Sequence, residues 1–516
     1  MYPGIHAERS PDKPAVILAE TGETLTYRQL NDDSIRIAKV LRELGLGHGD
    51  TYAILMGNST EYFSVCWAGQ RSGLYYVPLN WHLTAPELAY IVANSGAKAI
   101  IADVACAQQA EALAAELTVP VAALSLGCEI DGYRSIESFA AWHSTGDLPD
   151  EEEGSDMVYT SGTTGRPKGG RRQLLGVHPR DLPPEVFAFF ALFELDNEDV
   201  RYLLPGAPLY HAAPLRFTMA ITRIGGTDIV MNAFDPHVAL QTIERYGVTH
   251  SQWVPTMFVR LLRLSESERR AHDLSTHRVA IHAAARCAVS VKSAMIDWWG
   301  PILHEYYGAS EGGGVAYISP QSWLEHRGSV GQAIHGQFHI LDDDGNELPA
   351  GQVGRIYASD AVPIEYLGDA EMTRRAYSRE GWTTVGDLGY LDPDGFLYLA
   401  ERRDDLIISG GVNIYPQEIE DVLIEHPAVA DVAVIGIPNE EWGQEIKAVV
   451  QPLDDVVPTA ELAEELTEFC RTRLAPYKIP RTIDFDRNLP RASSGKLYKR
   501  RLAERYWKDE SAPQHP

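Results

Sequence analysis

Long apolar runs are missing from this chain. No stretch approaches the ~20 consecutive apolar residues that a membrane-spanning helix requires, so no integral membrane contact is expected. The N-terminal segment MYPGIHAERSPDKPA has neither a basic region nor an apolar core, so no secretory leader is expected. Cysteine is also scarce: the five cysteines are dispersed and form no CxxC pair. Such thiols are typical of a reduced, cytoplasmic protein.

Positive charge is in deficit as well. The chain has 45 Lys and Arg against 72 Asp and Glu, a net charge of −27, and a pI of about 5.0. So acidic a chain is poorly suited to the phosphate backbone of DNA or RNA, and no nucleic-acid partner is expected. Any anionic ligand must then be bound by a few local groups rather than attracted by the electrostatic field of the whole protein.

What the chain does contain is an alternation of short apolar strands and amphipathic helices. The segments 51–57 and 97–103 are typical of buried strands, and 156–160 predicts a further strand. Apolar residues within 26–44 recur at helical spacing, and Gly45 follows as a stop signal. A chain of 516 residues needs more than one core. The pattern predicts an α/β fold whose large, multi-subdomain N-terminal domain is built on mainly parallel sheets.

A second pattern begins near residue 400. Segment 416–426 predicts a helix with Pro416 near its start, and 461–474 predicts another, with strands between them. This self-contained α+β pattern indicates a small C-terminal domain. We therefore expect two domains, 1–402 and 403–516.

The most informative segment is YTSGTTGRPKG at 159–169. Glycines let the backbone approach a ligand closely, hydroxyls add hydrogen-bond donors, and a lysine adds a point charge suited to phosphate. The spacing of a Walker A loop is absent. The candidate phosphate-binding residues are Thr160, Ser161, Gly162, Thr163, Thr164, Gly165 and Lys168. The plain alternative is an ordinary flexible Ser/Gly turn.

At these residues the chain resembles the adenylate-forming superfamily: acyl-CoA synthetases, aryl-CoA ligases, luciferases and the adenylation domains of peptide synthetases. It looks closest to bacterial acyl-CoA ligases, and the resemblance recurs in order along nearly the whole chain. It implies that the 159–169 loop covers the β- and γ-phosphates of ATP. It also implies ATP, Mg²⁺ and coenzyme A as cofactors, and a reaction in which a carboxylic acid becomes an acyl-adenylate and then a thioester.

Three later motifs hold the nucleotide contacts that the resemblance implies. HAAARC at 282–287 would pass beside the adenine, although Arg286 departs from the family's proline pattern. In YYGASEGG at 306–313, Tyr307 would stack on the adenine, and in WTTVGDLGYLDPDG at 382–395, Asp387 would bind the ribose. The full set of implied contacts is Ala284, Ala285, Arg286, Tyr306, Tyr307, Gly308, Ala309, Ser310, Asp387 and Arg402, with Glu311 and Thr160 as Mg²⁺ ligands. Taken alone, Glu311 would be a solvated loop acid.

The resemblance also implies three catalytic residues. His211, in PLYHAAP, would lie near the substrate carboxylate, and Glu311 would act through the metal that it binds. Lys496 follows a Ser-Ser-Gly turn, and its cation would stabilise charge on the reacting carboxylate and α-phosphate. A lone histidine is otherwise most often a satisfied core or surface residue.

Adenylate formation and thioester formation need different residues at the same site. In the family that the chain resembles, the small C-terminal domain rotates between these two half-reactions. The hinge corresponds to Asp404. In the second state Gly410 and Gly411 would leave room for the pantetheine arm of coenzyme A, and Trp442 would lie near that tunnel. The plain alternative for Trp442 is a packed surface tryptophan.

The expected acyl pocket is apolar, with small residues on one wall. Its lining residues are His211, Phe217, Trp253, Val254, Ala283, Gly308 and Gly313. No acidic residue stands where an amino-acid ammonium would need a partner, which disfavours amino-acid activation. We expect a small carboxylic acid with a bulky apolar, aromatic or fatty body. Two alternatives stay open: loading of a carrier-protein phosphopantetheine thiol, and a non-catalytic nucleotide-binding module. A homodimer is compatible with the sequence but is not indicated by it.

Overall fold

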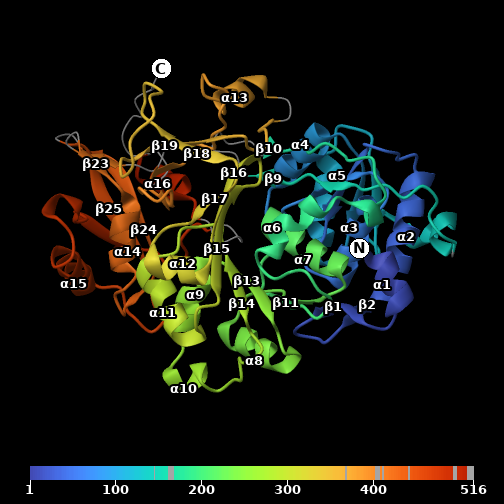
Figure 1. Ribbon diagram of the computed structural model, residues 1–516, viewed down its shortest axis with the longest axis horizontal. Coiled ribbons are helices and arrows are strands. Elements are labelled where there is room, and N and C mark those ends of the chain that lie inside the picture. The colour runs from blue at the N-terminus through green and yellow to red at the C-terminus, as the bar shows by residue number, and fades with distance from the viewer. Residues whose placement is uncertain are drawn as a thin grey trace.

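The computed structural model describes residues 1–144, 146–160, 168–366, 369–400, 407–409, 412–439, 442–491 and 497–507. Two large sheets, a smaller antiparallel sheet and a C-terminal sheet account for most of the strands. In Figure 1 the N-terminal elements lie on the right, the yellow-green central sheet runs through the middle, and the orange and red C-terminal elements lie on the left. The expected α/β fold is confirmed.

The first large sheet is parallel throughout, in the order β7-β6-β5-β3-β4-β8. Its strands are β3 (Thr51–Leu55), β4 (Tyr75–Pro78), β5 (Ala97–Ala102), β6 (Ala122–Ser125), β7 (Arg134–Ser135) and β8 (Ser155–Asp156). Helices α3 (Thr60–Gln70), α4 (Ala85–Ser95) and α5 (Ala107–Glu116) connect them. The strands expected at 51–57 and 97–103 are β3 and β5.

The second large sheet has nine strands in the order β17-β16-β15-β14-β13-β11-β12-β1-β2. They are β1 (Pro14–Leu18), β2 (Thr24–Thr26), β11 (Arg201–Leu204), β12 (Thr227–Val230), β13 (His250–Trp253), β14 (Val279–His282), β15 (Leu303–Ala309), β16 (Gly312–Ile318) and β17 (Gln332–His335). The run from β1 to β15 pairs in parallel, and β2, β16 and β17 pair antiparallel at the two edges. The parallel run places the carboxyl ends of β11, β13, β14 and β15 at one edge.

Helices cover both large sheets. They are α1 (Pro3–Arg9), α2 (Tyr27–Glu43), α6 (Ala188–Ala191), α7 (Ala212–Ile224), α8 (Pro236–Tyr246), α9 (Pro255–Leu262), α10 (Glu266–Arg269), α11 (Val289–Trp299) and α12 (Pro320–Glu325). The expected helix at 26–44 is α2. Thr26 and Gln29 form a capping box at its start, and Gly45, with φ +83°, follows its last turn. The indole of Trp67 in α3 donates to Thr222 in α7 over 2.9 Å, which ties the helices of the two sheets together.

The single strand expected at 156–160 is wrong. The segment is divided between β8, which pairs in parallel with β4, and β9 (Tyr159–Thr160), which pairs antiparallel with β10 (Lys168–Gly169). The pairing partner therefore changes within five residues, although local composition is uniformly strand-like. This change carries the chain from the first large sheet into the Ser/Gly-rich loop.

The remaining elements form two smaller sheets. The antiparallel sheet contains β18 (Gln337–Leu341), β19 (Gly354–Ser359), β20 (Leu388–Leu391) and β21 (Leu397–Leu399), and α13 (Ala370–Arg375) lies between β19 and β20 in sequence. The C-terminal sheet contains β22 (Ile407–Ser409), β23 (Val412–Ile414), β24 (Val429–Asn439), β25 (Gly443–Pro452) and β26 (Thr482–Phe485). Its helices are α14 (Pro416–Leu423), α15 (Ala460–Arg471) and α16 (Lys499–Trp507). Ile419, Leu423 and Leu466 form part of its own hydrophobic core.

Two contacts join the C-terminal elements to the central sheet's helices and loops. Arg286, after β14, lies 3.5 Å from the carboxylate of Asp421 in α14, and Arg263, at the end of α9, donates to the carbonyl of Val429. Within the residues that the structure describes, no helix combines the length and apolar character needed to cross a membrane.

Candidate active site

Strand register brings three of the predicted pocket residues, Trp253, Val254 and Ala283, to the carboxyl edge of the nine-stranded sheet. Trp253, His282 and Glu305 lie side by side on β13, β14 and β15. The residues that leave these strands, Val254 and Ala283, therefore emerge at the same level as Tyr306. Ligands of open α/β sheets bind at this kind of edge.

His211 reaches the same edge from the segment after β11. It is the N-cap residue of α7, and the backbone N–H of Leu209 just before it donates to Asn58 Oδ1 over 3.0 Å. The His211 ring lies 4.6 Å from that of Tyr210. Burial, with a smaller contribution from His82, lowers the pKa of His211 to about 4. The imidazole is therefore neutral at pH 7, so it offers hydrogen bonds rather than a positive charge.

Phe217, one and a half turns further along α7, lies in an aromatic wall. Its ring centroid lies between 5.3 and 6.2 Å from those of five other aromatic residues. These are Phe189, Phe190, Phe193, Tyr202 and Tyr306. Phe217 and Tyr306 were expected at the site, whereas Phe189, Phe190, Phe193 and Tyr202 were not. The aromatic-rich run at 187–193 is the sequence signal that would have indicated this wall.

The two tyrosines of β15 face opposite ways, as successive residues of a strand must. Tyr306 joins the aromatic wall, whereas the Tyr307 hydroxyl donates to Asp387 Oδ2 over 2.8 Å. The structure therefore brings together two predicted nucleotide residues that are 80 positions apart. A small cavity of ≈ 20 Å³ beside Tyr307 has room for about one water.

The glycines after Tyr307 are required by close backbone packing. Gly313 has φ +91° and donates its N–H to Val362 over 2.8 Å. A Cβ on Gly314 would lie 2.7 Å from the Phe338 ring. Gly313, expected in the acyl pocket, thus lies against the 362–364 segment and Thr383, while a Cβ built on Gly308 would lie 3.6 Å from Val315, an ordinary van der Waals distance. Ala309 and Gly312 pair across the turn that holds Ser310 and Glu311.

The Ser/Gly-rich loop is held at its base by the β9–β10 pair, in which Lys168 lies opposite Thr160. Its exit reaches the Glu311 turn: a Cβ built on Gly170 would lie 3.7 Å from the Glu311 Cα. Figure 1 shows β9 and β10 next to β16, which follows that turn. A partly exposed carboxylate beside a hydroxyl- and glycine-rich loop is the oxygen donor set that Mg²⁺ shares with phosphates, so the residues present fit this ion.

Several predicted residues lie outside the described residues. They are Ser161, Gly162, Thr163, Thr164, Gly165, Arg402, Asp404, Gly410, Gly411 and Lys496, together with the side chains of Thr160 and Lys168. Trp442 is described: its indole is 39% exposed, and the Arg481 guanidinium lies 5.1 Å from its ring.

The loop after β14, which was expected to pass beside the adenine, has an additional contact with the C-terminal elements. Ala284 has φ +74°, a conformation that costs energy for any residue with a Cβ. Ala284 and Ala285 are exposed, whereas Arg286 is turned toward Asp421 of α14. The predicted nucleotide contact Arg286 is therefore also a link to the C-terminal elements.

A buried charged cluster that the motifs did not indicate supports this edge. Lys292 Nζ in α11 lies 2.6 Å from Glu305 Oε2, and His282 Nε2 lies 3.4 Å from the same oxygen. All three side chains are at least nine-tenths buried. Burial raises the pKa of Glu305, and Lys292 opposes that rise. Because Ala283 follows His282 and Tyr306 follows Glu305, this cluster helps to fix the backbone at Ala283 and Tyr306.

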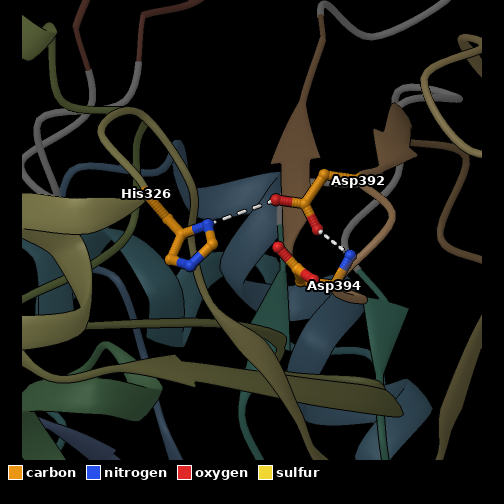
Figure 2. Close-up of side chains that lie close together, drawn as sticks. All are labelled: His326, Asp392 and Asp394. Atoms are coloured by element: carbon orange, nitrogen blue, oxygen red, sulfur yellow. Dashed lines mark hydrogen bonds and ion pairs between the residues drawn. The ribbon is translucent and has the colours of Figure 1, made fainter.

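A second group of His and Asp side chains lies at the turn between β20 and β21. Figure 2 shows His326, Asp392 and Asp394 turned toward one another. Asp392 Oδ1 accepts from the backbone N–H groups of Asp394 and Phe396, and His326 Nδ1 lies 3.3 Å from Asp392 Oδ2. The His326 ring also stacks on Phe396 at 3.6 Å. These contacts make Asp392 the internal cap of a turn.

Known proteins resemble this chain over nearly its whole length. Residues 5–362 match the family described as AMP-binding enzyme, and residues 418–496 match the AMP-binding enzyme C-terminal domain. A feruloyl-CoA synthase of Amycolatopsis sp is 34% identical, covering 98% of both chains, and the fatty acid–(acyl-carrier-protein) ligase ScoC of Streptomyces coeruleorubidus is 32% identical, covering 98% of this chain and 95% of its own. The structure of o-succinylbenzoate CoA synthetase MenE from Bacillus subtilis, in complex with its acyl-adenylate intermediate, has a TM-score of 0.77 and 27% identity and covers 97% of each chain.

The chain belongs to the AMP-binding enzyme family. It is an AMP-forming ligase that activates a carboxylic acid as an acyl-adenylate and passes the acyl group to coenzyme A or to a carrier-protein thiol. ATP, Mg²⁺ and coenzyme A are the cofactors of this class.

Proposed function

We propose that the chain is an acyl-CoA ligase for a carboxylic acid with an apolar, aromatic or fatty body. The observation that carries this proposal is the aromatic wall around Phe217, which adjoins Tyr306 and begins one and a half turns after His211. Aromatic rings provide a large apolar contact area for an acyl group. The feruloyl-CoA synthase among the relatives, which by its name acts on an aromatic acid, supports the same class of acid.

We assign the nucleotide to the edge between the 159–169 loop and Asp387. Tyr307 would stack on the adenine and Asp387 would accept from the ribose, while the loop would hold the phosphates. Glu311 would hold Mg²⁺, which supplies charge neutralisation when bound. Neutral His211 would donate one hydrogen bond to the substrate carboxylate and so orient it.

The chemistry divides into two balanced steps. A carboxylate oxygen attacks the α-phosphorus of ATP, and a P–O bond forms as the bond to pyrophosphate breaks. The acceptor thiol then attacks the acyl carbonyl: a C–S bond forms, AMP leaves with the C–O electron pair, and the thiol proton passes to solvent. Positioning and neutralisation of anions account for most of the rate gain in such phosphoryl chemistry.

We propose the domains 1–402 and 403–516, with the hinge at Asp404. Lys496 would serve the first step, and the 410–411 glycines with Trp442 would accommodate the pantetheine arm in the second. Free cysteines, four of the five buried, support a cytoplasmic location. A homodimer is the assembly we propose to test by light scattering, where a mass near 57.1 kDa would contradict it.

Acid-dependent release of pyrophosphate tests the proposal. The purified chain, ATP and Mg²⁺ are assayed with aryl, medium-chain and polycyclic carboxylic acids, and coenzyme A is then compared with a holo carrier protein as acceptor. We expect release with at least one of these acids and thioester formation with coenzyme A. Nucleotide binding with no acid-dependent release would contradict ligase activity, and acyl transfer to the carrier protein alone would favour the loading enzyme.

Substitution of Lys496 separates the two steps. We expect Lys496→Ala to slow adenylate formation by roughly 10²–10³-fold, the usual effect of removing one transition-state donor, and to affect thioester formation from pre-made acyl-adenylate far less. Arg501→Ala, at an exposed position of α16, is the control. Equal losses in both steps would remove the role given to Lys496.

A further inference from the structure

A cavity of ≈ 390 Å³ lies at the amino edge of the nine-stranded sheet, beside the starts of β14 and β15. Its walls come from the end of α10 and the loop after it, the last two residues of α11, and the residues that lead into β14 and β15. None of the residues predicted for the nucleotide or acyl site lines it. Figure 1 shows α10 at the bottom of the view, and β9 and β10, which flank the Ser/Gly-rich loop, near the top. The cavity is therefore separate from the candidate active site, and its volume is typical of a small-molecule site.

Two tryptophans form one side of this cavity. The ring centroids of Trp298 and Trp299 lie 5.6 Å apart, with 53° between the ring planes. His277, which is 6% exposed, lies edge-on to Trp299 at 4.9 Å, and burial lowers the pKa of this histidine to about 3, so it is neutral at pH 7. Leu274 and Ile302 add to the apolar lining. Such a surface suits a ligand with a planar, apolar body.

The charged residues that line the cavity are all basic. They are Arg269, Arg270 and His272, and no acidic residue lines it, although the whole chain has 72 Asp and Glu against 45 Lys and Arg. Two of the three have a carboxylate partner outside the lining: Arg270 Nη2 lies 2.7 Å from Glu266 Oε1, and His272 Nδ1 lies 2.8 Å from Glu244 Oε2. Among the described residues, the Arg269 side chain has no ion pair and no hydrogen bond. One positive charge in the cavity is therefore uncompensated.

Two N–H donors of the lining residues also lack an acceptor. Arg269 Nε and Trp299 Nε1 are shielded from water and have no hydrogen-bond partner within the part of the chain that the structure describes. Buried polar groups in folded proteins are nearly always paired, so each such donor indicates a missing acceptor. The Arg269 guanidinium lies 5.5 Å from the centroid of the Trp298 ring, and a small rotation of either donor's side chain toward the cavity would bring its N–H to a bound oxygen. The missing acceptor would thus lie beside the two tryptophans.

We propose that this cavity binds an aromatic carboxylate, at a site separate from the catalytic one. Arg269 would pair with the carboxylate, for which the planar guanidinium fork is suited, and the aromatic body would lie against Trp298 and Trp299. One uncompensated arginine matches a single negative charge, whereas a phosphate monoester carries nearly two at pH 7. Binding at this cavity needs neither ATP nor turnover, so the inference stands or falls independently of the proposed function.

Fluorine NMR of the full chain labelled with 5-fluorotryptophan tests this site. The chain has ten tryptophans, and the resonances of Trp298 and Trp299 are assigned from the variants Trp298→Phe and Trp299→Phe. The protein is titrated with 1-naphthoate in the absence of ATP. We expect both resonances to shift and to saturate. Trp81, whose ring lies 6.4 Å from that of Tyr210 beside the proposed acyl site, reports binding there instead.

Arg269→Met should weaken 1-naphthoate binding at Trp298 and Trp299 by roughly tenfold or more, the usual effect of losing one hydrogen bond to a charged group. Arg245→Met is the matched control and should leave binding unchanged, because Arg245 also lies over a neighbouring ring, 5.0 Å from that of Tyr246, but does not line the cavity. Equal weakening by both variants would contradict the role of Arg269.

Three further results would overturn the proposal. The first is the absence of a saturable shift at Trp298 and Trp299, including a titration in which only Trp81 responds. The second is equally tight binding of the uncharged 1-naphthylmethanol, which would show that no anion is recognised. The third is tighter binding of phenyl phosphate or AMP at the same two resonances, which would assign the cavity to a phosphate ligand.

Discussion

Asp228 in β12 has a carboxyl group that is buried without a hydrogen-bond partner among the described residues. It is fully buried, and neither of its carboxylate oxygens has a hydrogen-bond partner among the described residues. Its strand neighbours are Val16 and Tyr202. Burial raises the pKa of Asp228 well above its ordinary value, because the interior disfavours the charged carboxylate. A raised carboxyl pKa stabilises the fold at low pH, and this contribution is lost as the pH rises from the unfolded pKa of 3.8 toward the folded one.

Asp228→Asn should therefore stabilise the protein at neutral pH, because an amide carries no ionisation penalty. The gain relative to the wild type should grow with pH, by up to about 1.4 kcal/mol per pH unit between the two pKa values. Thermal unfolding at pH 5, 6, 7 and 8 measures it. Asp12→Asn, at an 87% exposed side chain, serves as the control. A difference that does not depend on pH would show that Asp228 is ionised in the fold.

The neutrality of His211 leads to a second expectation. With a pKa lowered to about 4, chiefly by burial, the imidazole should not titrate between pH 5.5 and 8. Proton NMR of the His211 Cε1–H, assigned by comparison with His211→Gln, should give a constant chemical shift over that range. A titration midpoint near 6.5 would mean that the ring is solvated and would remove the orienting role proposed for it.

Among the structural elements, β14, β15 and α11 are linked by the buried cluster of His282, Glu305 and Lys292, to which each element contributes one residue. Lys292 also lies 4.9 Å from the Trp323 ring of α12. The desolvation cost of these buried charges is compensated only while all three residues are present. Removal of one residue leaves the others without a partner in a low-dielectric interior. The cluster therefore links the strand register to the position of Ala283 and Tyr306.

Lys292→Met is expected to destabilise the protein by about 3–5 kcal/mol, the usual loss when one partner of a buried ion pair is removed. Denaturant unfolding measures this change. The double variant Lys292→Met/Glu305→Gln should recover part of the loss, because the stranded carboxylate is gone. Lys98→Met, which breaks an exposed pair with Asp50, should cost about 1 kcal/mol or less. Similar losses for the two single variants would contradict the buried-cluster account.

For the molecule as a whole, two polar contacts among the described residues join the two family segments. Arg286 and Arg263 belong to the 5–362 segment, whereas Asp421 and Val429 belong to the 418–496 segment. The Arg286 and Asp421 side chains are 30% and 23% exposed, so their interaction is weak. A weak polar interface is compatible with the domain rotation that we propose between the two half-reactions.

Removal of the Arg286–Asp421 pair should loosen this interface without unfolding either part. We expect Asp421→Asn to speed hydrogen exchange in α14 by up to about fivefold, equivalent to about 1 kcal/mol, with little change in the melting temperature. The swapped variant Arg286→Asp/Asp421→Arg should restore the slow exchange. If the swap exchanges as fast as Asp421→Asn, the pair does not hold the interface.

Local patterns in the sequence predicted the fold class and several of its elements. The alternation of strands and helices predicted the α/β fold, and the helix at 26–44 was confirmed with its capping residues and its glycine stop. The family resemblance implied that Tyr307 and Asp387 contact the nucleotide, and the structure places the Tyr307 hydroxyl 2.8 Å from Asp387 Oδ2. Such features depend on periodicity, caps and glycine-rich turns, which are encoded within a few residues.

Only the tertiary structure decided which distant side chains meet. The single strand expected at 156–160 is divided between two sheets, and Asp156 thereby meets Arg216, which is 60 residues away. The same holds for Lys292 with Glu305 and for Arg286 with Asp421. A strand's own residues define its period and its faces but not its neighbours, because pairing and register are set by the competition of all strands for one core. The class of reaction therefore follows from the sequence, and the neighbours of each candidate site residue follow from the fold.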